Sequence, residues 1–139
     1  MRAFLDTNVI IDFYAKREDF FLPASVIIDL AYRKRIEIVV SSLTFVNAFF
    51  ILRKVYNKKN LYLKLSQLAD ICTITKIDEE IIKSCLQNEV ADFEDAVQYA
   101  SSRALDVDVI VTRNPKHFSE FNVLVQTPSE FLNDVSLAF

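Results

Sequence analysis

Glycine is missing from the sequence altogether, although a chain of 139 residues ordinarily carries about ten. Glycine-rich phosphate loops of the Walker type and the GxGxxG turn both need a backbone without Cβ beside the phosphates. The GxSxG turn that exposes a nucleophilic serine is excluded for the same reason. If this protein works on phosphate groups, it must therefore use side chains and metal ions rather than a backbone cradle.

The sequence is also poor in cysteine, in long apolar runs and in net charge. Cys72 and Cys85 match no zinc-binding or redox spacing, so we expect two reduced thiols. No run of about 18 apolar residues occurs, and an acid comes before any signal-like stretch; we expect no membrane span and a cytoplasmic protein. The net charge of −3 gives no overall attraction for nucleic acid, so a polyanion would need a local basic patch.

The chain is rich in apolar and aromatic residues. Hydrophobic residues make up 52% and aromatic residues 12% of the sequence, far more than a disordered chain carries. No linker, low-complexity stretch or repeat divides it, so we expect one domain over residues 1–139. Without glycine, its tight turns should use residues such as Asn57 to Asn60 and Asn114, which tolerate left-handed geometry.

Short β-branched runs alternate with longer helical stretches along the chain. The runs at 2–6, 36–41, 71–75, 108–112 and 123–125 are each short enough to be a buried strand. Apolar spacing predicts helices at 8–15, 19–35, 43–57, 61–70, 78–89 and 92–105. Buried strands separated by helices pair in parallel through right-handed crossovers. The sequence therefore predicts an α/β protein, a three-layer α/β/α fold with a central parallel sheet of about five short strands.

Polar residues follow three of the predicted strands. Open parallel sheets place their functional sites at the carboxyl ends of the strands, so we expect these residues to gather at one edge. They are Asp6, Thr7 and Asn8, with Asp12 one helical turn on; Ser41, Ser42, Thr44 and Asn47; and Thr112, Arg113, Asn114 and His117. Asp6 has a second interpretation as the N-cap of the helix that follows it.

Three acids within residues 92–95 open a predicted helix. Asp92 can cap this helix, and Asp95 at its third position can complete a capping box. Asp95 nevertheless falls on the apolar side of the helix, so we expect its carboxylate to point inward. Asp6 and Asp95 would repel each other unless a cation lay between them. Oxygen-rich clusters of this kind select Mg²⁺ or Mn²⁺ over zinc.

Five segments together resemble the PIN domain family, and more narrowly the small prokaryotic PIN proteins related to VapC-type toxins. They are LDTNVIID at 5–12, SSLTFVNAFFILRK at 41–54, DFEDAVQYAS at 92–101, VIVTRNPKHF at 109–118 and VLVQTPSEFL at 123–132. Their order and spacing cover essentially the whole chain. The resemblance implies an α/β/α fold and a metal-dependent endoribonuclease, whose acidic cluster holds Mg²⁺ or Mn²⁺ and activates water for phosphodiester cleavage.

The resemblance also implies roles for particular residues. Asp6 and Asp95 would be the metal ligands, and Asp92 stands close enough to assist, with Glu94 in reserve. Asn8 would support the turn after the first strand, and Thr112 and Asn114 would line the site after the fourth predicted strand.

Two positions depart from the family pattern. Asn47 stands where many PIN domains have glutamate, and His117 stands where a TRN-x-x-D-F variant has aspartate. Fewer carboxylates predict weaker Mg²⁺ binding. His117 has three interpretations: a ligand for a softer metal such as Mn²⁺, a base, or a solvent-facing loop residue.

RNA would be held by basic residues near the predicted mouth of the site. The candidates are Arg113, Lys116, Arg53 and Lys54, with Lys58 and Lys59 beyond them. Such side chains would contact phosphates without reading the base sequence. The cluster at 53–59 has an alternative interpretation as the solvated C-terminus of a helix, where cations complement the dipole.

Apolar surface predicts partners. Phe45, Phe49, Phe50 and Tyr56 fit a core or a dimer surface better than base stacking, so we expect a homodimer or an antitoxin-like partner. Two functions stay open at this point. The first is an endoribonuclease, the toxin of a toxin–antitoxin pair. The second is a PIN-like scaffold that has lost catalysis and binds nucleic acid or protein, which the missing acids at 47 and 117 support.

Overall fold

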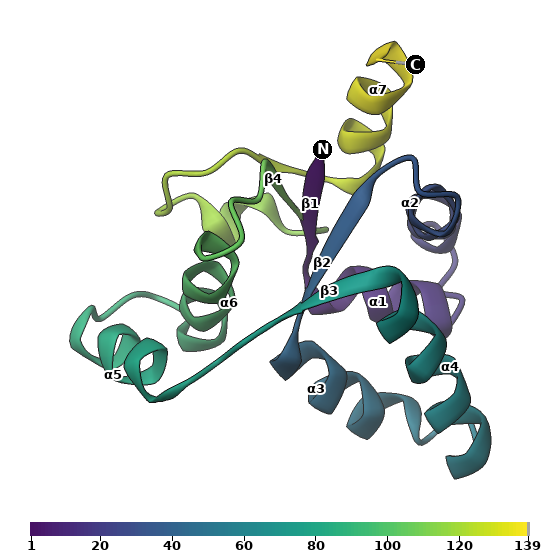
Figure 1. Ribbon diagram of the computed structural model, residues 1–139, viewed down its shortest axis with the longest axis horizontal. Coiled ribbons are helices and arrows are strands. Elements are labelled where there is room, and N and C mark those ends of the chain that lie inside the picture. The colour runs from purple at the N-terminus through teal and green to yellow at the C-terminus, as the bar shows by residue number, and fades with distance from the viewer. Residues whose placement is uncertain (139) are drawn as a thin grey trace.

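A parallel sheet of five strands forms the centre of the computed structural model, which describes residues 1–138 (Figure 1). Phe139, the last residue of the expected domain, lies outside the described residues. The strands are β1 (Arg2–Leu5), β2 (Glu37–Ser41), β3 (Cys72–Thr75), β4 (Val109–Val111) and β5 (Val125–Gln126), in the order β3-β2-β1-β4-β5. All four pairings are parallel. The predicted sheet is confirmed.

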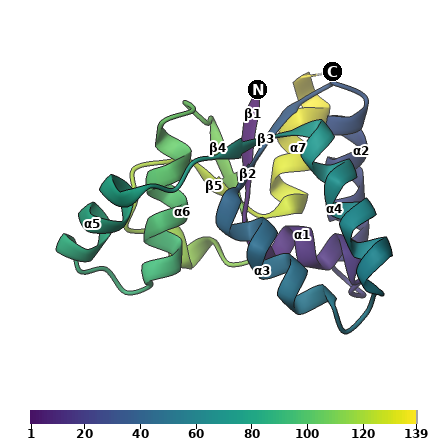
Figure 2. The same ribbon diagram turned by 60° about the horizontal axis from the view of Figure 1, so that its bottom comes forward.

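Helices cover both faces of this sheet, which confirms the three layers. Helices α5 (Glu79–Gln87) and α6 (Phe93–Arg103) lie on one side (Figure 2). The other side carries α1 (Thr7–Tyr14), α2 (Phe21–Tyr32), α3 (Ser42–Leu52), α4 (Lys58–Ile71) and α7 (Pro128–Ala138). A short 3₁₀ helix, η1 (Pro115–Phe118), follows β4.

The alternation of side chains along β1 explains why both faces are covered. Ala3 and Leu5 point into the larger core, which α1 to α4 and α7 complete, whereas Phe4 points to the opposite face and packs with Phe118. All four side chains are fully buried. A strand with apolar residues on both faces is stable only when both faces are covered.

The helices expected over 43–57 and 61–70 were wrong at the ends that face each other. The helix expected over 43–57 ends at Leu52, and a new helix begins at Lys58, whose N-cap Asn57 accepts a hydrogen bond from the Asn60 N–H at 2.9 Å. No glycine or proline marks this break, so the spacing of apolar residues predicted a helix that continued past Leu52. Lys58 and Lys59 therefore lie in the first turn of α4, and the alternative interpretation of this cluster as a helix C-terminus does not hold for them.

Helix α7 was not predicted from the sequence, although a signal for it was present. Thr127 and Glu130 form a reciprocal capping box: the Thr127 N–H donates to Glu130 Oε1 at 2.9 Å, and the Glu130 N–H donates to Thr127 Oγ1 at 3.2 Å. This T-x-x-E pattern before an apolar stretch is a recognised start of a helix. Phe131 and Val135 then bury against α2 and the core.

The left-handed turns lie elsewhere than predicted. Lys16, Asp19, Lys34 and Asp106 have positive φ angles of 51°, 60°, 61° and 49°. Asn57, at −70°, and Asn114, at −121°, do not. Two lysines thus occupy positions that glycine fills most easily, because left-handed geometry brings Cβ close to the following carbonyl oxygen.

Two further expectations concern membranes and thiols. Within residues 1–138, every helix is too short or too polar to cross a membrane. Cys72 and Cys85 are both free thiols, as predicted. Burial raises the pKa of Cys72 to about 12, so this thiol is not a reactive thiolate.

Candidate functional site

Asp6 lies at the junction of β1 and α1, at the carboxyl edge of the sheet. Its N–H donates to the Val111 carbonyl of β4 at 3.0 Å, and its side chain caps α1 by accepting a hydrogen bond from the Thr7 N–H at 2.7 Å. The residue is 7% exposed. Both interpretations of Asp6 are therefore compatible, because one oxygen caps the helix while the carboxylate stays at the edge where strands end.

Three side chains from other positions also donate to Asp6. Gln98 Nε2 of α6 lies 3.0 Å from Oδ1, Thr112 Oγ1 lies 2.8 Å from Oδ2, and Asn8 Nδ2 lies 3.1 Å from Oδ2. With the Thr7 amide this makes four donors on two oxygens, and an ionised carboxylate accepts at about four sites. The orientation of Asp6 is thus held from α1, α6 and the segment after β4.

The segment after β4 closes around the same point. Thr112 is fully buried and accepts a hydrogen bond from the Asn114 N–H at 3.1 Å, while Asn8 Oδ1 accepts from the Arg113 N–H at 3.3 Å. Asn8 Nδ2 also lies 3.3 Å from Thr112 Oγ1. Three of the residues predicted to support the site, Asn8, Thr112 and Asn114, are therefore brought together.

Asp92 and Asp95 lie at the N-terminus of α6. Asp92 is the N-cap and accepts a hydrogen bond from the Asp95 N–H at 3.0 Å, which confirms the predicted cap. Asp95 is 7% exposed, and its Oδ2 is buried without a hydrogen-bond partner, so its carboxylate does point inward. Burial, followed by the charges of Asp92 and Asp6, raises the pKa of Asp95 to about 7, although His117 acts in the opposite direction.

These acids share one open cleft of about 280 Å³, which we call the acidic cleft. It is lined by Asp6, Thr7, Asn8, Ile11, Arg17, Ile51, Asp92, Glu94, Asp95 and His117. Four of the ten lining residues are carboxylates. Burial and the charges of Asp6 and Asp92 also raise the pKa of Glu94. The cleft therefore concentrates negative charge that solvent does not fully screen, which favours a cation.

The residues present fit a Mg²⁺ or Mn²⁺ ion held by few protein ligands. Within residues 1–138, no three His, Cys, Asp or Glu side chains already converge as a complete metal site. Mg²⁺, however, keeps several waters and commonly takes only one or two carboxylates together with substrate phosphates. The unpartnered Oδ2 of Asp95 supplies one such ligand, and the neighbouring Asp6 would supply the second by giving up one of its four hydrogen bonds.

The residues at the two departures from the family pattern lie differently. Asn47 is half-buried in α3 and does not line the acidic cleft. His117 does line it, with Nδ1 3.7 Å from Asp95 Oδ2 and a side chain that is 59% exposed.

The residues predicted to bind RNA are not gathered into one patch. Arg113 points away from the acidic cleft: its Nε forms an ion pair with Asp12 at 2.7 Å, and its guanidinium lies 4.3 Å from the ring centre of Phe20. Arg53 packs on the ring of Phe50 at 4.0 Å. Lys54 and Lys116 are exposed, and Lys116 is the neighbour of His117 on η1.

Sequence reasoning missed two side chains near the cleft, Gln98 and Arg17, and assigned no contact to a third, Asp12. Gln98 is fully buried and lies one helical turn after Asp95, the i,i+3 spacing that places two side chains on one helix face. Arg17 lines the cleft, and its Nη1 lies 3.6 Å from Asp12 Oδ1. Asp12 is 1% exposed, and burial raises its pKa whereas Arg113 and Arg17 lower it. No motif signalled Arg17, whereas Asp12 ends the LDTNVIID segment and only its ion pairs were not predicted.

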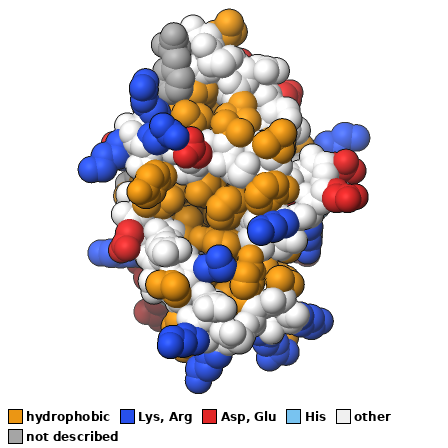
Figure 3. All heavy atoms as spheres, turned by 90° about the vertical axis from the view of Figure 1, so that its right-hand side faces the viewer, with side chains coloured by type: hydrophobic (Ala, Val, Ile, Leu, Met, Phe, Trp, Pro, Cys, Tyr) orange, Lys and Arg blue, Asp and Glu red, His pale blue; other side chains and the backbone are white. Residues whose placement is uncertain are grey.

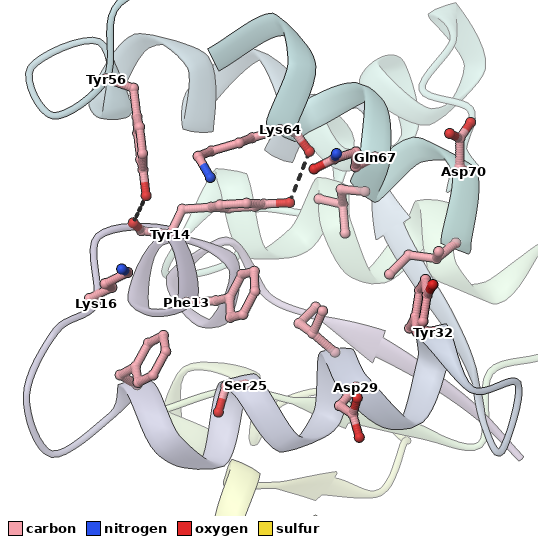
Figure 4. Close-up of a pocket in the computed structure, with 14 residues that line it drawn as sticks. Phe13, Tyr14, Lys16, Ser25, Asp29, Tyr32, Tyr56, Lys64, Gln67 and Asp70 are labelled. Carbon is pink, nitrogen blue, oxygen red and sulfur yellow. Dashed lines mark hydrogen bonds between the residues drawn. The ribbon is translucent and has the colours of Figure 1, made fainter. Parts of the chain in front are cut away.

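A larger groove lies between α1, α2 and α4, and we call it the aromatic groove. Figure 4 shows its residues, which are Phe13, Tyr14, Lys16, Phe21, Ser25, Ile28, Asp29, Tyr32, Tyr56, Lys64, Gln67, Leu68, Asp70 and Ile71. Its volume is about 650 Å³. Hydrogen bonds tie its walls together, because the Tyr56 hydroxyl donates to the Tyr14 carbonyl and the Tyr14 hydroxyl donates to the Lys64 carbonyl. Figure 3 shows hydrophobic side chains gathered on the face that α2 and α4 form, with Lys and Arg around them.

A second apolar groove of about 630 Å³ lies between α3 and α4. It is lined by Phe45, Val46, Phe49, Phe50, Arg53, Tyr62, Leu65, Ser66, Ala69 and Ile74. We call it the α3–α4 groove. Val46 and Phe50 are 68% and 59% exposed, so large apolar side chains face solvent here.

Known structures share this architecture at low sequence identity. A toxin–antitoxin complex from Klebsiella pneumoniae aligns with a TM-score of 0.66 and 21% identity, over 91% of this chain and 97% of that one. VapBC2 from Rickettsia felis, bound to a DNA fragment from its promoter, aligns with a TM-score of 0.64, 19% identity and coverage of 91% and 97%. Mycobacterium tuberculosis VapC20, described as a toxin that cleaves the sarcin–ricin loop, aligns with a TM-score of 0.60, 12% identity and coverage of 78% and 86%.

The sequence comparison is more specific. No curated protein sequence matches the chain significantly. The family model of the PIN domain, however, matches residues 2–116, which include both strand ends that form the site and the acidic start of α6. The chain therefore belongs to the PIN domain family.

Proposed function

We propose that this protein is a cytoplasmic, metal-dependent endoribonuclease of the VapC type, which cleaves RNA phosphodiester bonds with activated water. One observation carries the proposal: Asp95 is 7% exposed with an unpartnered Oδ2, and it lies beside Asp6 in an open cleft at the carboxyl edge of the sheet. A buried, unpartnered carboxylate oxygen is costly in a structural role. It is explained when a cation binds there.

The acids of the cleft and the residues that orient them then have separate roles. Asp6 and Asp95 hold Mg²⁺ or Mn²⁺, and Gln98, Thr112 and Asn8 fix the orientation of Asp6 through hydrogen bonds of 3.0, 2.8 and 3.1 Å. The bound ion supplies charge neutralisation at the phosphate and lowers the pKa of water. Asp92 keeps the start of α6 in place through its hydrogen bond to the Asp95 N–H, which in turn positions the Asp95 carboxylate.

The proposed substrate is a structured RNA. VapC20, which shares the fold, is described as cleaving the sarcin–ricin loop. In this chain, Arg17 lines the acidic cleft and Lys116 is exposed beside His117, so both are placed to meet phosphates at its mouth. Contacts of this kind carry no base readout, so the shape of the RNA would select the substrate.

The proposed protein partner is an antitoxin. Four of the structures that share the fold are described as VapBC, FitAB or toxin–antitoxin assemblies. The aromatic groove suits a protein segment, because it combines an apolar floor with Lys16 and Lys64 toward one end and Asp29 and Asp70 toward the other (Figure 4). A large exposed apolar surface rimmed by polar residues is a common mark of an interaction site.

Self-association is proposed for the α3–α4 groove. Phe45, Phe49 and Phe50 line it, and a role for these aromatic residues in a dimer surface stays a prediction. Sedimentation of wild type and Phe50→Lys tests this assignment. A dimer that dissociates in the variant supports the groove, and a wild-type monomer at all concentrations contradicts it.

The alternative is a binding module that has lost catalysis. It is favoured by the absence, among the described residues 1–138, of a preassembled three-ligand site, and by Asn47 lying outside the cleft. Incubation of a structured RNA with the protein in Mg²⁺, in Mn²⁺ and in chelator separates the two functions. Metal-dependent cleavage that Asp95→Asn abolishes supports the endoribonuclease. Equal cleavage by both proteins would rule out the assigned site, and binding without cleavage in any metal would favour the binding module.

A further inference from the structure

His117 is the only histidine of the sequence, and it lies at the rim of the acidic cleft. The 3₁₀ helix that carries it is anchored by Phe118, which is fully buried against Phe4 and Ile110 of the sheet. The His117 N–H donates to the Asn114 carbonyl at 3.0 Å. The backbone at His117 is thus fixed while its side chain, 59% exposed, is free to change rotamer.

We propose that His117 provides a nitrogen ligand to the ion held by Asp6 and Asp95, so that the cleft prefers first-row transition ions such as Mn²⁺ and Zn²⁺ to Mg²⁺. This inference rests on the proposed function only in taking the two carboxylates as metal ligands. It concerns which ion the site selects, and it stands apart from whether RNA is cleaved.

The spacing of His117 Nδ1 and Asp95 Oδ2 is slightly longer than that of two ligands of one ion. Nitrogen and oxygen ligands lie about 2.0–2.2 Å from such an ion, which places two of them roughly 3.0–3.4 Å apart in octahedral or tetrahedral geometry. His117 Nδ1 lies 3.7 Å from Asp95 Oδ2. This distance is longer than a shared ion allows, so binding would require the exposed ring of His117 to rotate toward Asp95. No three such ligands are already assembled within residues 1–138.

The contact is not already satisfied as a hydrogen bond. Asp95 Oδ2 is buried and has no hydrogen-bond partner, and 3.7 Å exceeds the range of an N–H···O bond. Asp95 Oδ2 therefore keeps a free lone pair, and His117 Nδ1 offers one when the imidazole is neutral and protonated at Nε2. The cleft also holds Asp6, Asp92 and Glu94, so an added cation is favoured there over a neutral ligand.

An imidazole nitrogen changes which ion is favoured. Mg²⁺ prefers oxygen ligands, whereas imidazole suits ions further along the first transition row, for which affinity rises toward zinc and copper. A site with two carboxylates and one imidazole therefore discriminates against Mg²⁺ more strongly than the carboxylates alone would. Replacing the imidazole should weaken the preference and leave the carboxylates in place.

The single histidine makes a direct test practicable. Long-range ¹H–¹⁵N spectra of the protein without a histidine tag report the ring nitrogens of His117 alone. We expect saturating Zn²⁺ to shift one ring nitrogen strongly and Mg²⁺ to leave both unchanged. The proposal would be overturned if wild type bound Zn²⁺, Asp95→Asn did not, and the chemical shifts of both His117 ring nitrogens stayed unchanged. The carboxylates would then hold the ion alone.

Affinities measured by calorimetry give a second, independent readout. In His117→Ala the Kd for Mn²⁺ and Zn²⁺ should rise by about tenfold or more, the usual scale for removing a group that supports a metal, with a far smaller change for Mg²⁺. His117→Asp should shift preference back toward Mg²⁺, and Glu120→Gln, on the same exposed segment, should change nothing. Equal losses for Mg²⁺ and Mn²⁺ in His117→Ala would contradict the inference, as would wild-type protein that binds none of these ions. If RNA cleavage in Mg²⁺ persisted under either of these two outcomes, the proposed function would still be supported although the inference about His117 had failed.

Discussion

Gln98 Nε2 donates a hydrogen bond to Asp6 Oδ1 at 3.0 Å, and this bond joins α6 to the end of β1 inside the fully buried layer of the protein. The same buried row continues to the end of β3. Ser101 Oγ donates to the Gln98 carbonyl at 2.9 Å, and Thr75 Oγ1 donates to Ser101 Oγ at 3.0 Å. The position of the Asp6 carboxylate therefore depends on side chains that never face the cleft.

Gln98→Leu tests this dependence. Leucine preserves most of the volume but leaves Asp6 with three donors instead of four, so we expect the free energy of unfolding to fall by about 1–2 kcal/mol. Mg²⁺ and Mn²⁺ affinity should fall by about 10–100-fold, as it does when an orienting partner of a metal ligand is removed. Calorimetry and denaturant unfolding measure the two effects. Gln87→Leu, on the exposed end of α5, is the control, and unchanged metal affinity in Gln98→Leu would exclude Gln98 as a positioning residue.

Asp95 makes stability depend on pH in a particular direction. Burial and the nearby acids raise its pKa from 3.8 to about 7, so between these values the folded state holds a proton that the unfolded state has lost. The stability that this bound proton gives the folded state is fully present below about pH 4 and is lost as the pH rises toward 7. With a chelator present, the free energy of unfolding of Asp95→Asn should therefore equal that of wild type near pH 4. Above pH 7 it should be higher by up to a few kcal/mol, at about 1.36 kcal/mol for each unit by which the pKa is raised.

Thermal unfolding from pH 4 to pH 8 checks this sign. The melting temperature of Asp95→Asn should move above that of wild type progressively across the range. A constant difference at all pH values would mean that Asp95 is ionised throughout and that the cleft does not raise its pKa.

Arg113 has a structural task that its predicted contact with RNA did not include. It pairs with Asp12, which is 1% exposed, and its removal leaves that buried carboxylate with only Arg17 at 3.6 Å. Breaking one side of a buried ion pair costs about 3–5 kcal/mol, and we expect the lower end for Arg113→Ala because Arg17 remains. Denaturant unfolding without RNA measures this loss. Lys116→Ala, which has no such partner, should unfold like wild type, and an equally stable Arg113→Ala would show that the pair is not structural.

Lys34 occupies a left-handed position, with φ of 61°, after the end of α2. Left-handed geometry costs a residue with Cβ about 1–2 kcal/mol, whereas glycine in exchange loses about 0.5–1 kcal/mol of chain entropy. Lys34→Gly should therefore stabilise the protein by about 0.5–1 kcal/mol, measured by denaturant unfolding. Lys34→Ala keeps Cβ and should give no such gain. A gain in both variants would point to lost charge rather than relieved strain.

The sequence was sufficient to predict the sheet and the two principal acids. Short β-branched runs between helical stretches imply buried parallel strands, and Asp6 ends the first of them. Asp95 is recognisable because an acid on the apolar side of a helix start needs a partner. Both inferences use local periodicity, which the tertiary structure then preserves.

The remaining features depend on packing that local patterns do not carry. The helix break at Leu52 lacks a glycine or proline, so only the Asn57 cap reveals it. Nothing in the sequence distinguishes Gln98 from an exposed polar residue of a helix, because its contact with Asp6 forms only when α6 packs near the end of β1. The pairing of Asp12 with Arg113 joins residues a hundred positions apart and turns Arg113 away from the cleft where RNA contacts were expected.

Two N-cap aspartates provide the most direct test of the central claim, that the acidic cleft is a nuclease site. Asp6 caps α1 inside the cleft, and Asp78 caps α5 outside it by accepting a hydrogen bond from the Ile81 N–H at 3.0 Å. Asparagine caps a helix as well as aspartate does, so both variants keep their caps. The amide NH₂ in Asp6→Asn would face two of the four donors to Asp6, so thermal unfolding first checks that this variant is folded at the assay temperature. The measurement is the rate of structured-RNA cleavage in Mn²⁺. We expect Asp78→Asn to cleave at the wild-type rate and Asp6→Asn to lose cleavage by about a hundredfold or more, whereas equal rates in both variants would contradict the assignment of the site.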